Sequence, residues 1–159
     1  MELKPIGVIR TPFADPSATP LQSLCTSAKG KIQLEQGYSE GVQNLTEFSH
    51  AYLIYLFHKA PLELLVEKPL TGEGPVHGIF STRHVNRPNR IDLSVVFLSE
   101  GNDHTIRFTG ADMLDGSLPL DIKPYIPSFD SVPEASSGWV DQEHMEQIQK
   151  GSQPNQTVK

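Results

Sequence analysis

The sequence of residues 92–110, DLSVVFLSEGNDHTIRFTG, decides the fold class. It contains two runs rich in β-branched and aromatic residues, at 92–99 and 105–110, on either side of the turn-forming triplet Gly101-Asn102-Asp103. Two such runs around a short glycine-containing turn are typical of neighbouring β-strands. The stretch therefore predicts two strands joined by a turn, and a mainly β fold.

Short apolar runs separated by turn residues continue along the rest of the chain. Residues 49–58 (SHAYLIYLFH) are so continuously apolar that we expect a strand buried on both faces, although periodicity alone also allows a short helix. Residues 12–30, with prolines at four-residue spacing, are expected to form a long loop of the kind that is usually functional or mobile. Further extended segments are expected at residues 6–10, 31–34, 77–81 and 118–125.

Helices are expected at only two places. Residues 62–67 are expected to form a helical turn before Pro69. Residues 137–150 are expected to form an acidic helix that frays from Gly151 onward. Many short strands with few helices favour a barrel or a sandwich.

The composition limits the function classes. The 159 residues include 13 Lys and Arg against 19 Asp and Glu, a formal net charge of −6. This balance argues against non-specific nucleic-acid binding, because attraction to phosphate comes from Lys and Arg. The single Cys25 excludes an intramolecular disulfide, and the six histidines show no metal-ligand spacing, so we expect no metal.

Targeting and cofactor motifs are also missing from the sequence. Neither a GxGxxG loop after a strand nor a Walker lysine loop is present. The first residues lack the apolar core of a signal peptide, and the longest apolar run, residues 51–57, is far short of the roughly 20 residues that a membrane span needs. We therefore expect a cytoplasmic protein without a membrane span.

Two polar stretches carry candidate chemistry. Arg83, Arg87 and Arg90 give the loop over residues 83–90 a local charge of +3, with no acidic residue among them. A solvated turn explains such a loop, but arginines around a rigid proline also suit recognition of carboxylate or phosphate. Asp121 and Lys123 are two residues apart and therefore share one face of an extended segment, as an exposed ion pair or as the rim of a ligand site.

Together these stretches resemble a known family. GIFSTRHVNRPNRIDLSVV (residues 78–96) and DMLDGSLPLDIKPYIP (residues 112–127) resemble the TsaA-like family, also called the YaeB-like or TrmO-type family. IGVIRTPF, GVQNLTEFSHAYLIYLFHKA and PSFDSVPEA agree with the same family, so the resemblance covers roughly residues 5–139. It implies a protein built on a β-barrel. With the helix expected from the sequence itself, we expect a mainly β protein with a single β-barrel domain and short helical segments over residues 1–138, followed by an acidic C-terminal helix and frayed tail over residues 139–159.

The resemblance also implies an activity. The family is one of S-adenosylmethionine-dependent methyltransferases, whose best-known type methylates N6 of N6-threonylcarbamoyladenosine beside the anticodon of certain tRNAs and forms homodimers. Matching motif by motif, the cofactor contacts implied in this chain are Pro20, Leu21, Gln22, His58, Lys59, Arg83, Leu93, Leu120, Asp121, Ile122 and Lys123.

Roles in the reaction follow as hypotheses. Asp121 and His58 are the candidates for a catalytic base, because the N6 proton must leave as the new bond forms. Arg87, Arg90 and Lys123 are candidates for binding the threonyl carboxylate or an RNA phosphate of the substrate.

The chain departs from the family pattern at a few positions. Leu21 stands where the family has Arg, Arg90 replaces a usual Pro, and Asp92 replaces a usual Gly. We expect Asp92 to place a carboxylate beside the pocket for the cationic sulfonium. Two alternatives therefore stay open: a methyltransferase of the same fold that acts on another nucleoside or a small metabolite, and a non-catalytic barrel that binds S-adenosylmethionine or RNA.

Overall fold

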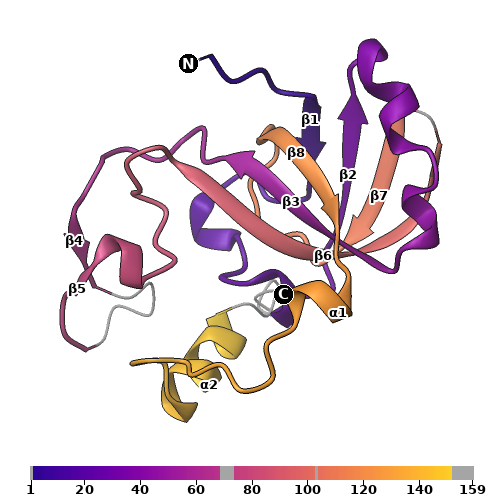
Figure 1. The fold of residues 1–159 in the computed structure, drawn as a ribbon. Coiled ribbons are helices and arrows are strands. Elements are labelled where there is room, and N and C mark those ends of the chain that lie inside the picture. Colours follow the sequence, from indigo (N-terminus) through magenta and orange to yellow (C-terminus); the bar gives the residue numbers. More distant parts are fainter. Residues whose placement is uncertain (1, 69–73, 103, 152–159) are drawn as a thin grey trace, which may run out of the picture.

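The computed structural model describes residues 2–68, 74–102 and 104–151. Strands dominate these residues (Figure 1). Their bounds are β1 (Gly7–Arg10), β2 (Lys29–Leu34), β3 (His50–Leu56), β4 (Val66–Glu67), β5 (His77–Gly78), β6 (Ile91–Asn102), β7 (Thr105–Thr109) and β8 (Leu118–Pro124).

Six strands form one antiparallel sheet in the order β1-β2-β7-β6-β3-β8, and β4 pairs with β5 separately. β6 and β7 pair through Phe97 and Thr109, which confirms the two strands expected from residues 92–110. The ladder shifts register between Ser99 and Asn102, at the start of the expected turn, and Asp103 lies outside the described residues.

The two edge strands of this sheet approach each other. Backbone hydrogen bonds join Ile6 N to Pro119 O (2.8 Å), Ile9 N to Ser117 O (2.9 Å) and Gly116 N to Ile9 O (2.9 Å). The sheet therefore curls so far that β1 meets the start of β8, but no continuous ladder closes it. The mainly β fold is confirmed, and barrel is a loose description of it.

Strand β3 lies between β6 and β8 and alternates between two environments. Ala51, Leu53 and Tyr55 are fully buried and form the centre of the core. Their neighbours Tyr52 and Ile54 are partly exposed on the outer face of the sheet. The strand expected over residues 49–58 is confirmed, but only its inner face is completely buried.

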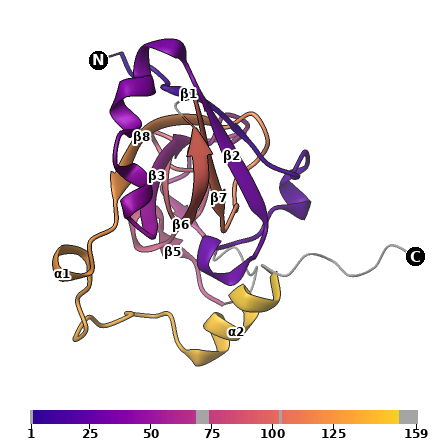
Figure 2. The same cartoon turned by 90° about the vertical axis from the view of Figure 1, so that its right-hand side faces the viewer.

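The helices are short. The α-helices are α1 (Pro127–Asp130) and α2 (Gln142–Gly151), and the 3₁₀ helices are η1 (Pro16–Ala18), η2 (Ser23–Cys25), η3 (Gln36–Val42), η4 (Leu45–Glu47) and η5 (Ile79–Ser81). Figures 1 and 2 show that the chain runs from the end of β8 through α1 to α2, which lies beneath the sheet.

Helix α2 begins later than the sequence suggests. Its N-cap is Asp141, whose carboxylate accepts a hydrogen bond from the His144 backbone N–H at 3.0 Å, so the helix starts at Gln142. Gly151, expected to fray, is its last residue, and residues 152–159 lie outside the described part of the chain. The domain boundary between residues 138 and 139 stays a prediction.

Two local expectations around β4 and β5 are wrong. The helical turn expected over residues 62–67 is extended, because the Leu64 N–H donates to Asn86 O (3.1 Å) and Leu65 O accepts from the Ile79 N–H (2.9 Å). These contacts, one with the arginine-rich loop and one with η5, hold the segment beside β5. The strand expected over residues 77–81 is limited to β5 and continues as η5.

Arg90 ends the arginine-rich loop in an unusual backbone conformation. Its φ is 53°, in the left-handed region that L-residues other than glycine, asparagine and aspartate rarely adopt. Its N–H donates to Arg87 O (3.1 Å) and its carbonyl accepts from the Phe57 N–H (2.8 Å), so this turn connects the loop to the end of β3. The proline common in the family cannot adopt this φ.

We expect Arg90→Pro and Arg90→Gly to change the free energy of unfolding in opposite directions. Proline removes the hydrogen bond to Arg87 and fixes a negative φ, which costs about 2–3 kcal/mol. Glycine relieves the left-handed strain and adds up to about 1 kcal/mol. Urea denaturation checks both values, and a glycine variant less stable than the wild type would contradict this view of the turn.

Candidate functional site

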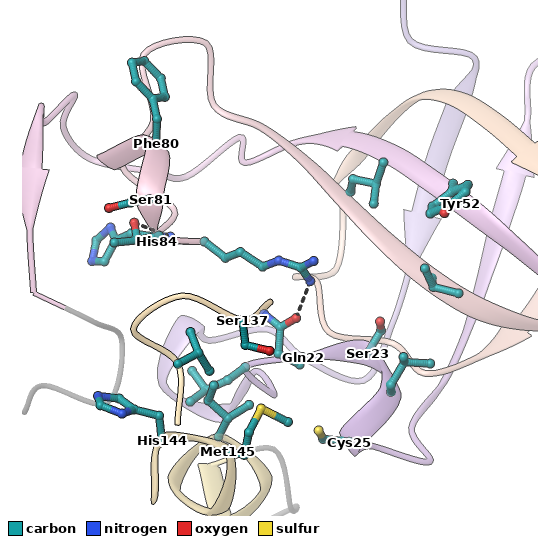
Figure 3. A pocket seen from close by; sticks show the side chains of 18 of the residues that line it. Gln22, Ser23, Cys25, Tyr52, Phe80, Ser81, His84, Ser137, His144 and Met145 are labelled. Atoms are coloured by element: carbon teal, nitrogen blue, oxygen red, sulfur yellow. Dashed lines mark hydrogen bonds between the residues drawn. The ribbon is translucent and has the colours of Figure 1, made fainter. Parts of the chain in front are cut away.

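A cavity of about 1040 Å³ lies against the outer face of the sheet (Figure 3). Its floor is formed by Tyr52 and Ile54 of β3 and by Leu93 and Val95 of β6. These residues alternate with the core residues of the same strands, because successive side chains of a strand point to opposite faces. The cavity is large enough for a nucleoside-sized ligand and is mostly apolar.

Polar side chains stand at the rim of the cavity. Arg83 Nη1 donates to Gln22 Oε1 at 2.8 Å, drawn as a dashed line in Figure 3. Lys123 lies 2.9 Å from Asp121 Oδ2, with about half of each side chain exposed. Arg83 and Lys123 supply cations on a mostly apolar wall that also includes the carboxyl group of Asp130, and such cations suit a ligand that carries a carboxylate.

The C-terminal segment closes another side of the cavity. Trp139 stacks on His77, with ring centroids 4.3 Å apart and an angle of 13° between the planes. Its indole Nε1–H donates to Ser81 O at 2.8 Å. We call Trp139, His77 and Ser81 the latch, because they fasten the segment that leads into α2 to the region around β5.

Behind the latch, α2 presents His144, Met145 and Ile148 to the cavity. His144 Nδ1 lies 2.7 Å from Asp141 Oδ1 and the ring packs edge-on against Trp139, with centroids 5.2 Å apart. The hydrogen bonds that His144 donates hold the pKa of Asp141 below its usual range. The cavity wall is thus an ordered aromatic and apolar surface.

A chain of polar groups crosses the core on the other side of the cavity floor. The Tyr55 hydroxyl lies 2.9 Å from Asp92 Oδ2 and 3.1 Å from Ser94 Oγ, and Ser94 Oγ lies 2.7 Å from Asp112 Oδ1. The Ser23 backbone also hydrogen-bonds Asp112, so this network reaches η2, which lines the cavity. Burial raises the pKa of Asp112 to about 7 and raises the pKa of Asp92.

The number of protons in this network depends on the charge state of its two carboxyl groups. Three oxygen–oxygen contacts need three protons, and the hydroxyls of Tyr55 and Ser94 supply two. The Tyr55 hydroxyl donates to Asp92 Oδ2 and the Ser94 hydroxyl donates to Asp112 Oδ1, so a hydrogen for the contact between the two hydroxyls requires a proton on one of the carboxyl groups. Both carboxyls charged would leave two oxygens facing each other without a hydrogen.

Comparison with known proteins identifies the family. The model of the tRNA-methyltransferase O N-terminal domain matches residues 8–131, which include the sheet and most of the cavity. The chain belongs to this family. The latch residue Trp139 and helix α2 follow the matched residues.

Individual relatives agree with this membership. A probable S-adenosyl-L-methionine-binding protein of Pyrococcus abyssi is 41% identical over 139 residues, covering 87% of this chain and 75% of the relative. The tRNA (adenine(37)-N6)-methyltransferase of Escherichia coli is 34% identical over 148 residues, covering 87% of this chain and 63% of the relative. The crystal structure of TrmO from Pseudomonas aeruginosa superposes with a TM-score of 0.74 at 36% identity, covering 87% of this chain and 61% of that one. The chain thus spans less than two thirds of the length of the last two.

The structure brings five of the cofactor residues implied by the family to the cavity: Leu21, Gln22, Arg83, Leu93 and Lys123. Asp121 joins them through Lys123 at the rim. The other implied residues lie outside the cavity lining: Pro20, His58, Lys59, Leu120 and Ile122.

His58 and Asp121, the two candidates for a base, are not adjacent. Asp121 pairs with Ile54 and Leu118 with Leu56, so His58 lies beyond the end of this ladder. There its Nδ1 is 3.4 Å from Ser117 Oγ, and burial, with help from the charge of Lys59, lowers the His58 pKa.

The substrate candidates in the arginine-rich loop have local partners. Arg87 Nη1 donates to Thr82 O (2.7 Å) and Ile79 O (3.1 Å), and its guanidinium lies 5.9 Å from the Phe80 ring centroid. These bonds tie Arg87 to the backbone of residues 79–82, so that it stabilises the loop. Arg90 forms the left-handed turn described above.

Asp92 corrects one expectation from the sequence. Its side chain points into the core toward Tyr55, whereas the next residue, Leu93, lines the cavity. The extra carboxylate is therefore not beside the cavity, and the fields of Arg83 and Arg87 partly offset its burial.

Sequence reasoning did not single out several residues that line or support the cavity. Trp139 carries a recognisable signal, because it is the only tryptophan and stands in a polar segment. Asp112 carries a weaker one, since it lies between the apolar Ala111 and Met113, both of which are buried. Nothing in the sequence marks Tyr55 as a hydrogen-bonding residue.

Residues 2–68, 74–102 and 104–151 contain neither a membrane-spanning helix nor a cluster of metal ligands. No helix in these ranges has the length and apolar character to cross a membrane. Within the same ranges, no group of three His, Cys, Asp or Glu residues is arranged to hold a metal ion.

The raised pKa of Asp112 predicts a pH dependence of stability. Its pKa is about 7 in the folded protein against an ordinary 3.8, so between these values the folded state keeps a proton that the unfolded state has lost. The free energy of unfolding should therefore fall as pH rises from about 4 to about 7, and level off above.

We expect Asp112→Asn to remove most of this slope, because asparagine has no titratable carboxyl group while its amide oxygen still accepts the hydrogen bond from Ser94. At pH 8 the variant should be more stable than the wild type by about 1–4 kcal/mol. Urea denaturation at a series of pH values measures this, with the exposed Glu40→Gln as the control. If the free energy of unfolding depended on pH equally in the wild type and in Asp112→Asn, the raised pKa of Asp112 would be contradicted.

Proposed function

We propose that this protein is an S-adenosylmethionine-dependent methyltransferase that methylates N6 of threonylcarbamoyladenosine beside the anticodon of tRNA, and that it works in the cytoplasm as a homodimer. Membership of the tRNA-methyltransferase O family supports the reaction class, and the Escherichia coli relative is named as a tRNA adenine N6-methyltransferase. The observation that carries the proposal is the cavity over β3 and β6, with Arg83, Gln22 and Lys123 at its rim.

The residues of the cavity fit the proposed cofactor. S-adenosylmethionine has a flat adenosine, a cationic sulfonium and an amino-acid end with a carboxylate. Tyr52, Leu93 and Val95 offer an apolar and aromatic surface for the adenosine, and Arg83 with Gln22 offers donors for the carboxylate. The carboxylate of Asp92, which the sequence suggested would lie beside the sulfonium, points toward Tyr55 in the core and away from the cavity.

When bound, the cofactor supplies an activated methyl group. The protein then has to align acceptor and donor and exclude water. The latch and α2 suit the second task, because they cover the cavity with the apolar side chains Val140, Met145 and Ile148. The ordered floor of β3 and β6 suits the first, because strands position side chains more rigidly than loops do.

Proton removal from N6 needs a base near the acceptor. Asp121 is better supported than His58, because Asp121 contacts Lys123, which lines the cavity, whereas His58 lies beyond the end of the β3–β8 ladder. The Lys123 Nζ lies 2.9 Å from Asp121 Oδ2 and so positions this carboxylate next to the cavity. The same Lys123 is placed to bind an anionic group of the acceptor.

A second candidate function is binding of the cofactor without transfer. The name of the Pyrococcus abyssi relative refers only to S-adenosyl-L-methionine binding, and the cavity described here would serve that role equally well. The two functions differ in whether an RNA product forms.

We expect Arg83→Ala to weaken S-adenosylmethionine binding about 10- to 100-fold, because it removes a charge-assisted hydrogen bond from the cavity rim. Isothermal titration calorimetry measures the affinity. The exposed Lys4→Ala, which removes one positive charge outside the cavity lining, serves as the control and should bind like the wild type. Unchanged affinity in Arg83→Ala would show that the cofactor binds elsewhere.

Methyl transfer is tested with purified protein, S-adenosylmethionine and two tRNA samples, one with threonylcarbamoyladenosine and one with unmodified adenosine at the same position. Mass spectrometry of the nucleosides should show one added methyl group on the threonylcarbamoyladenosine only. Cofactor binding with neither tRNA methylated would favour the binding function. Methylation of the unmodified adenosine alone would overturn the proposed acceptor.

A further inference from the structure

Three cations face solvent in one row across the outer face of the sheet. In the ladder register Arg10 of β1 lies opposite Lys31 of β2, and Lys31 lies opposite Arg107 of β7. All three are exposed, while their neighbours Ile9, Ile32 and Ile106 are buried in the core. We call Arg10, Lys31 and Arg107 the cationic row, which lies on strands seen side by side in Figure 2.

The cationic row is poorly neutralised. Arg10 has a 3.4 Å contact with Asp115 and a hydrogen bond to Gln33. Among the described residues, no carboxylate is within ion-pair distance of Lys31 or Arg107. Like charges directly opposite each other destabilise a sheet. A protein with a net charge of −6 therefore concentrates unpaired positive charge where it costs stability.

The outer face of the sheet links this row to the cavity. Arg107 is paired with Ser99 of β6, and the next outward residues along β6 are Phe97 and then Val95 of the cavity floor. Ser99 and Val95 are four residues apart, about 13 Å along a strand. Phe97, between them, is 50% exposed and packs edge-on against His50 at 5.4 Å.

Cations beside an exposed aromatic ring are the surface that proteins use to bind single-stranded RNA: the cations attract phosphates and the ring stacks with a base. An acidic peptide would bind the three cations but has no base to stack on the Phe97 ring. A membrane surface would bind the cations without any use for the neighbouring cavity. Both therefore explain the surface less well than RNA does.

We propose that the cationic row and Phe97 form the surface on which the RNA substrate lies, with its phosphates on Arg10, Lys31 and Arg107 while the target nucleotide reaches the cavity. This inference rests on the proposed function for the identity of the RNA. It assigns a binding role to strands β1, β2 and β7, which take no part in the cavity.

The test measures binding of a fluorescent anticodon stem–loop by anisotropy over a series of KCl concentrations. Each phosphate contact adds about 0.7–0.9 to the slope of log affinity against log salt. Lys31→Gln/Arg107→Gln should therefore lower the slope by about 1.4–1.8 and weaken binding about tenfold at low salt. Phe97→Leu should weaken binding with no change in slope, because it removes stacking and no charge.

The control is Lys4→Gln/Lys150→Gln, which removes two exposed positive charges outside the row and should keep the wild-type slope. The melting temperature of the row variant should equal or exceed that of the wild type, since a repulsion is removed. An unchanged slope in the row variant would overturn the proposal. So would selective loss of binding to phosphatidylserine vesicles with RNA binding intact, which would make the partner a membrane.

The RNA-binding surface and the proposed methyltransferase function can be refuted independently of each other. Methyl transfer by the wild type together with an unchanged slope in the row variant would refute the RNA surface and leave the proposed function standing. A slope that depends on the row, without methyl transfer to either tRNA, would refute the proposed function and leave the RNA surface standing. Calorimetry with S-adenosylmethionine should give the same affinity for the row variant as for the wild type.

Discussion

The arrangement of the molecule depends on strand β3, which is hydrogen-bonded on both edges and has one face in the core and the other under the cavity. Ala51, Leu53 and Tyr55 fill the core, and Tyr52 and Ile54 form the floor of the cavity. Because side chains alternate strictly, a slip of one residue in the pairing would exchange the two sets. The pairing of β3 with β6 and β8 therefore fixes the core and the candidate site at once.

Two sets of polar contacts hold the walls of the cavity on this floor. Inside, the network that begins at Tyr55 ends at Asp112, which binds the backbone of Ser23 and so steadies η2. Outside, the Trp139 indole binds Ser81 and stacks on His77. A buried network of this kind is costly unless its members are satisfied, and the raised pKa of Asp112, about 7, allows that carboxyl group to take up a proton. The site is thus built on the core rather than added to the surface.

Local patterns in the sequence predicted the strands well, because alternation and turn residues are local signals. They failed at residues 62–67, where bonds to distant backbone groups decide the conformation, and at the start of α2, where the Asp141 cap decides it. The family resemblance supplied Gln22 and Arg83, which the structure joins at 2.8 Å. The cationic row could not be predicted from the sequence, because Lys31 and Arg107 become neighbours only through the register of β2 and β7.

We propose that S-adenosylmethionine binds in the cavity beside the latch, and one measurement tests this most directly. Trp139 is the only tryptophan of the chain and lines this cavity, so its fluorescence reports on the site directly. Titration with S-adenosylmethionine should change the emission in a saturable way, with the same dissociation constant as calorimetry gives. Binding seen by calorimetry without any change in Trp139 emission would contradict the claim and place the cofactor elsewhere on the protein.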